Sequence, residues 1–173
     1  ALLKRSFQYD ISDLVYYFQC AKEKLSLRLS SIVENVHGLD FVPPVQLYQS
    51  ILGVHGQQWI ELFAEIEKCS DYEYLILDLT DGVADLWDIL RSCTHVYTIT
   101  RGDGVSLAKM DQYERGLRTM EYEDVLAKTR KIEFPVFKEI PIRFDELTYG
   151  DLARYVKQYI IPDFAGEKEE GNE

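Results

Sequence analysis

The chain has 173 residues, 46% of them hydrophobic and 28% charged, a composition typical of a globular protein long enough to bury a core. Thirty acidic residues against nineteen basic ones give a net charge of −11, which disfavours binding to the phosphate backbone of nucleic acids. No window approaches the roughly 18 apolar residues of a membrane span, and the early basic pair Lys4 and Arg5 argues against a signal peptide.

Three cysteines, Cys20, Cys69 and Cys93, are far apart in the sequence and form no pair with metal-ligand spacing. This pattern predicts free thiols rather than a disulfide framework or a zinc site, and therefore a cytoplasmic location. The chain starts with Ala rather than Met, and we expect it to be a fragment of a longer protein.

The first predicted element is helical. Ser12 and Asp13 open an apolar-periodic stretch that runs to Val36 and predicts one broken helix or two helices. Gly38 closes this stretch. Residues 39–45 then predict a short strand that ends at a pair of prolines, because proline cannot donate to a sheet ladder.

Strands and helices alternate in the middle of the sequence. Residues 57–68 form an amphipathic helical pattern, and residues 74–77 (YLIL) predict a central parallel strand, apolar on both faces. A helix is predicted over 81–93 and a second strand over 95–100. Ser106 can then cap the next helix.

The remaining elements are a short helix over 121–128, an extended piece over 131–137, and a last helix with an apolar stripe formed by Leu152, Tyr155, Val156 and Tyr159. Alternating strands and helices predict an α/β fold, with a parallel sheet covered by helices on both faces. We expect one domain over residues 1–163 and a disordered acidic tail over 164–173.

The run DYEYLILDLTDG, residues 71–82, is the most informative segment for function. The predicted strand places Asp78 at its carboxyl end, where open α/β sheets bind ligands. Asp81 and Gly82 form the turn into the next helix, and glycine lets the backbone approach a ligand. A carboxylate here suits a magnesium–phosphate site. The alternative is that Asp78 merely caps the following turn.

The order of elements over residues 9–120 resembles the MinD/ParA/CpaE group of P-loop ATPases, and the CpaE-like branch most closely. The quoted run is similar to that family's strand and switch turn. The later run HVYTITRGDGVSLAKM resembles its next strand and helix. The resemblance implies that Asp78 is the catalytic-site aspartate that helps hold Mg²⁺ through water. It also implies that Gly82 and Asp81 lie beside the bound ATP or ADP.

Two departures from the family pattern stand out. The turn carries Thr80 and Asp81 where the family has proline or small residues, which adds negative charge beside the phosphates. No GxxxxGK[ST] loop, whose backbone N–H groups and lysine hold phosphate, occurs in the 173 residues. We therefore expect no hydrolysis, and no cofactor, for this chain alone, although a longer parent protein would use ATP and Mg²⁺.

Three functions remain open at this stage. The resemblance implies an ATPase-type switch used in intracellular positioning, pilus or secretion assembly, or partitioning. The second is a non-catalytic scaffold that keeps the fold and binds a protein partner or a second copy of itself. The third is a receiver-like signalling module, with Thr100 as its hydroxyl residue. No membrane anchor and no nucleic-acid partner is expected in any of them.

Overall fold

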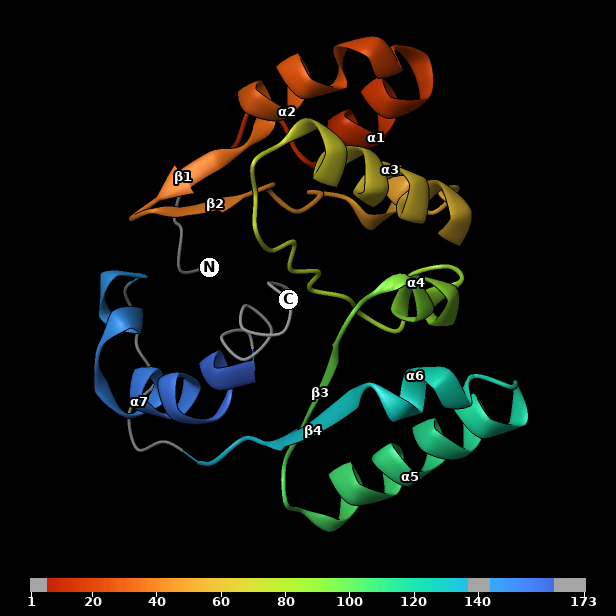
Figure 1. Cartoon of the computed structure of the whole chain (residues 1–173), viewed down its shortest axis with the longest axis vertical. Helices are drawn as coiled ribbons and strands as arrows, with labels where there is room; N and C mark the ends of the chain where they lie inside the picture. Colours follow the sequence, from red (N-terminus) through yellow and green to blue (C-terminus); the bar gives the residue numbers. More distant parts are fainter. Residues whose placement is uncertain (1–5, 137–143, 164–173) are drawn as a thin grey trace, which may run out of the picture. The chain divides into compact units, whose positions relative to one another are not determined.

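The computed structural model describes residues 6–136 and 144–163 (Figure 1). The chain divides into two compact units, of which the larger spans Phe7–Phe134. In the smaller unit, the described elements are η3 (Phe144–Thr148) and α7 (Gly150–Tyr159). The predicted tail, 164–173, lies outside the described residues.

The N-terminal part of the larger unit is helical, as the sequence predicted, and the helix is broken by a 3-10 turn. The elements are α1 (Ile11–Cys20), η1 (Lys22–Lys24) and α2 (Leu25–Ile32). A capping box starts α1: Asp10 accepts a hydrogen bond from the backbone N–H of Ser12 at 2.8 Å, and the Asp13 carboxylate accepts one from the Asp10 N–H at 2.9 Å. These bonds satisfy N–H groups that a helix start leaves without partners.

A short antiparallel hairpin follows, formed by β1 (Glu34–Val36) and β2 (Leu39–Phe41). The prediction that the helix continues to Val36 is wrong. His37 and Gly38 both have positive φ, 53° and 86°, and form the two-residue turn that right-twisted strands favour. The turn pairs the residues on either side of it, so residues 34–36 are a strand.

The first hydrophobic core lies among α1, α2 and α3 (Gly56–Cys69). A short 3-10 helix, η2 (Tyr48–Ile51), precedes α3 in the sequence. The amphipathic pattern over 57–68 is confirmed, with Trp59, Leu62 and Ile66 buried on one face of α3. The next helix, α4 (Leu86–Ser92), is shorter than predicted. Ile89 of α4 belongs to this core.

The second core lies between β3 (Val96–Thr100), α5 (Gly104–Thr119) and α6 (Glu123–Ala127). Its buried residues are Val96, Leu117 and Val125, and Trp87 and Leu90 of α4 pack against them. Thus α4 contributes to both cores.

The strand predicted over 95–100 is confirmed as β3, but its partner was not anticipated. β3 pairs in parallel with β4 (Thr129–Glu133), in a register that sets Val96 opposite Thr129 and Thr100 opposite Glu133. Figure 1 draws β3 in green and β4 in cyan. β4 overlaps the start of the stretch over 131–137 that the sequence indicated only as extended.

The predicted central strand over 74–77 is wrong. Residues 71–80 have no regular secondary structure, and Figure 1 draws them as a coil between α3 and α4. A strand exists only when its backbone pairs with a neighbour, and no described strand lies against this run. The fold is mixed α/β with a two-stranded parallel sheet, and a large parallel sheet with helices on both faces is not formed by the described residues.

The smaller unit confirms the last predicted helix. In α7, Ala153 is buried, and the rings of Tyr155 and Tyr159 lie 4.9 Å apart between centroids. No helix in the described part of the chain is both long and apolar enough to cross a membrane.

Candidate functional site

The run that carried the functional hypothesis is exposed in the structure. Residues 75–79, which we call the open segment, show the alternation of a half-buried strand from Ile76 onward. Leu77 and Leu79 pack against the first core, whereas Ile76 and Asp78 face solvent. Ile76 keeps 77% of its surface exposed. The segment therefore has one packed face and one open face.

The backbone of the open segment is not hydrogen-bonded to a neighbouring strand among the described residues. No N–H or C=O group of residues 75–79 makes a hydrogen bond to any residue that the structure describes. Backbone polar groups are nearly always paired when a segment becomes buried. A row of such groups beside exposed apolar side chains has the chemistry of a sheet edge.

A tyrosine fixes the start of this run. The Tyr72 hydroxyl donates a hydrogen bond to the Asp40 carboxylate of β2 at 2.9 Å. Partial burial, and secondarily this bond to a carboxylate, raise the pKa of Tyr72. The phenol therefore stays protonated and able to donate near neutral pH. This hydrogen bond connects the residues just before the open segment to the β1–β2 hairpin.

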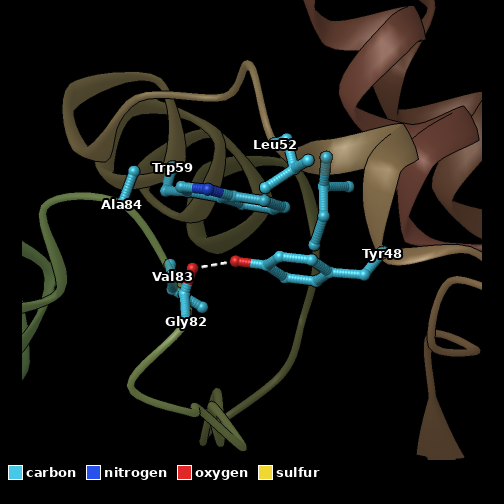
Figure 2. A pocket seen from close by; sticks show the side chains of 7 residues that line it. Tyr48, Leu52, Trp59, Gly82, Val83 and Ala84 are labelled. Atoms are coloured by element: carbon cyan, nitrogen blue, oxygen red, sulfur yellow. Dashed lines mark hydrogen bonds between the residues drawn. The ribbon is translucent and has the colours of Figure 1, made fainter.

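A second tyrosine fixes the other end. Figure 2 shows the Tyr48 hydroxyl donating to the carbonyl oxygen of Gly82, across a small pocket. The pocket has a volume of about 80 Å³ and is lined by Tyr48, Ile51, Leu52, Trp59, Gly82, Val83 and Ala84. The Val83 N–H also donates to the Thr80 carbonyl at 3.3 Å, which closes a turn directly after the open segment.

The turn into α4 is held by Asp85. This residue has left-handed backbone angles, φ 53° and ψ 35°, which aspartate tolerates better than most side chains do. Its carboxylate accepts a hydrogen bond from the Gly56 N–H at 2.8 Å, and so caps the start of α3 instead of its own helix. A Cβ at Gly56 would lie 2.5 Å from the Asp85 Cβ, so only glycine fits there.

A polar network lies on the other side of α4. The Arg91 guanidinium makes two bonds to the Asp124 carboxylate, at 2.8 and 2.9 Å, and lies 4.0 Å from the centre of the Tyr122 ring. The Arg91 hydrogen bond lowers the pKa of Asp124. Tyr122 donates to Asp88 at 2.6 Å, and this bond raises the pKa of the phenol. These contacts join α4 to α6.

An open depression of about 630 Å³ begins at this network and reaches the start of α3. Its lining residues are His55, Gln57, Ile60, Asp85, Asp88, Arg91 and Ser92. Asp85, Asp88 and Arg91 already have partners within the fold. We assign these contacts to structure rather than to a ligand.

The three residues predicted from sequence, Asp78, Asp81 and Gly82, lie near one another in the chain, and no hydrogen bond joins them. Asp78 and Asp81 are exposed and make no hydrogen bond or ion pair to a described residue, and the Gly82 carbonyl accepts from Tyr48. No group of three carboxylate, histidine or cysteine side chains in the described part of the chain could hold a metal ion. The roles of these residues beside ATP and Mg²⁺ stay predictions.

Comparison of the chain with protein-family models, curated proteins and solved structures gave no match. The resemblance to the MinD/ParA/CpaE ATPases therefore rests on the residues quoted above.

Sequence reasoning missed Tyr48, Tyr72 and Asp85, the side chains that hold the run in place. Asp85 precedes an apolar-periodic stretch, so a capping role was readable from the sequence. The helix that it caps, α3, begins 29 residues earlier in the chain, and only the tertiary structure brings the two together.

Proposed function

We propose that this chain is a protein-interaction domain that binds another polypeptide through the open segment. The observation that carries this proposal is the exposure of Leu75 and Ile76 in the segment, at 37% and 77% of their surfaces, and of Tyr74 directly before it, at 44%. Contiguous exposed apolar side chains on a folded domain mark surfaces that bind protein. Aromatic residues such as Tyr74 are enriched in such interfaces.

The anchors on both sides of the segment support this function. Tyr72 bonds to Asp40 before the segment, and Tyr48 bonds to Gly82 after it. Leu77 and Leu79 hold the middle against the core. A segment fixed in this way loses little conformational entropy when a partner binds, and this lowers the free-energy cost of association.

The experiment places a photo-crosslinking amino acid at Ile76 in the native host cell. A matched control carries it at Gln112, an exposed position on α5. We expect a crosslinked protein that is specific to position 76. Purified, that protein should bind the chain, and Ile76→Asp should weaken binding about tenfold, or 1.4 kcal/mol, whereas Gln112→Asp should not. Identical crosslinks at both positions, or an affinity unchanged by Ile76→Asp, would overturn the proposal.

The second candidate is part of a MinD/ParA/CpaE-like switch that acts in positioning, pilus or secretion assembly, or partitioning. The observation in its favour is the order of Asp78, Asp81 and Gly82 after an apolar run. Calorimetric titration with ATP and Mg²⁺ tests it. This chain alone should bind no tighter than about millimolar, near −4 kcal/mol.

In a protein or complex that supplies a phosphate-binding loop, this candidate predicts nucleotide binding that Asp78→Ala weakens without unfolding the domain. Equal binding by the wild type and Asp78→Ala in that context would remove Asp78 from the site.

A further inference from the structure

We infer that the open segment binds its partner by β-strand addition, and that the partner is an extended strand in which apolar residues alternate with Lys or Arg. The inference rests on the proposed function and specifies how the same surface works. It has three supports: the alternation of side chains, the state of the backbone, and the charge around the segment.

The alternation of side chains gives the segment the geometry of a strand. Leu77 and Leu79 point to the core, and Ile76, Asp78 and Thr80 are exposed. A period of two is the spacing of an extended chain, because successive side chains point to opposite faces. The partner's side chains would meet Ile76 and Asp78 on the open face.

The backbone supplies the means of recognition. The N–H and C=O groups of residues 75–79 are not bonded to any described residue. An added strand would satisfy every second pair of them, as in other complexes that extend a sheet edge. Main-chain bonds give affinity in this mode, and the alternate side chains give specificity.

Charge decides between a second copy of this chain and a different partner. Two copies paired antiparallel about Leu77 would set Glu73 opposite Asp81 at both ends. Parallel copies in register would set Asp78 beside Asp78. Like charges directly opposite each other destabilise a strand pair, and the chain carries a net charge of −11. A strand with a basic residue opposite Asp78 has the complementary charge.

The test uses the 173-residue chain and a synthetic peptide of about nine residues, a common strand length, in which Val and Ile alternate with Lys and Thr. The control peptide has the same side chains but methylated amide nitrogens through its centre, so it keeps the charge and cannot form a ladder. Amide hydrogen exchange reports on residues 75–79 one by one. With the first peptide at about ten times its Kd, alternate amides in this range should exchange roughly tenfold more slowly.

Two variants sharpen the result. Asp78→Asn should weaken the affinity for the first peptide severalfold at low salt. This effect should shrink as the salt concentration rises. Asp111→Asn, which removes an exposed charge from α5, should leave binding unchanged.

Equal binding of both peptides would show that charge alone attracts them and would overturn strand addition. Protection of residues 75–79 that rises with protein concentration without peptide would mean that the occupant is a second copy. A crosslinked partner that needs Ile76 but leaves these amides unprotected would sink strand addition while the proposed function stands. If residue 76 contacts no partner at all, the proposed function itself fails.

Discussion

Two stretches of this chain share one sequence design but have different structures. Each is an apolar run followed by a turn and a helix: the open segment leads through Asp85 into α4, and β3 leads through Asp103 into α5. β3 has a partner strand, β4, whereas the open segment has none among the described residues. The open segment, which begins with the apolar residues Leu75, Ile76 and Leu77, is the one without a strand partner. Strand formation depends on an available neighbour, and not on composition alone.

The two helices also start differently. The Asp103 carboxylate caps its own helix by accepting bonds from the backbone N–H groups of Val105 and Ser106, at 3.0 and 2.9 Å. Asp85 instead caps α3. The open segment and α4 are thus held by side chains from elsewhere in the fold. β3 and α5 are held by the local hydrogen bonds of Asp103 and by the pairing of β3 with β4.

The largest expected loss of stability is in the second core, which β3 and α5 share. Leu117 of α5 is fully buried in the second core beside Val96. Leu117→Ala should lower the free energy of unfolding by about 2–5 kcal/mol, because it removes buried apolar contacts and leaves a cavity. Urea denaturation measures the change. Leu107→Ala is the control, since Leu107 lies on the same helix but is exposed. Equal losses for the two variants would contradict the assigned core.

The open segment predicts a contrast between adjacent residues. Leu77→Asp should lower the free energy of unfolding by about 1–3 kcal/mol, because it places a carboxylate against the first core. Ile76→Asp should change it by less than about 0.5 kcal/mol, because Ile76 faces solvent. A buried central strand would make both variants equally unstable. Denaturation of the two proteins in parallel therefore decides which description holds.

Replacing glycine by alanine should have opposite effects on stability at the first residues of α3 and α5. Gly56→Ala should destabilise the fold by about 1–3 kcal/mol, because the new methyl group would overlap Asp85. Gly104→Ala, also at the first residue of a helix, meets no atom within 4 Å and should be neutral or stabilising by up to about 1 kcal/mol. Thermal unfolding of both variants tests this. Stabilisation by Gly56→Ala would show that Asp85 does not hold the turn.

The smallest effect concerns pH. Hydrogen bonds from Ser106, its backbone N–H first, lower the pKa of Asp103 below its ordinary value of 3.8. A pKa lowered by folding means that the ionised cap stabilises the fold above pH 3.8 and loses this contribution as pH falls through the folded-state pKa. The difference in Tm between the wild type and Asp103→Ala should be constant near neutral pH and shrink in acid. Asp103→Asn, which keeps an acceptor oxygen, should show a smaller difference at neutral pH.

Part of the site could be predicted from the sequence. Residues 71–82 were identified as the functional segment, and they contain the exposed apolar surface on which the proposals rest. The roles of Asp78, Asp81 and Gly82 in a nucleotide site stay predictions. The placement of Asp78 at the end of a strand was wrong, because the partner that would make 74–77 a strand is not among the described residues.

The sequence by itself determined several of the local elements. The apolar periodicity of α3 and α7, the apolar run of β3 and the break between α1 and α2 were all readable, because helices and strands leave their own spacing in a sequence. The tertiary structure alone decided which strands pair and which side chains hold the turns. The pairing of β3 with β4, and the bonds from Tyr48 to Gly82 and from Gly56 to Asp85, join residues about 30 positions apart. Such contacts depend on how the whole chain packs, and local spacing carries no record of them.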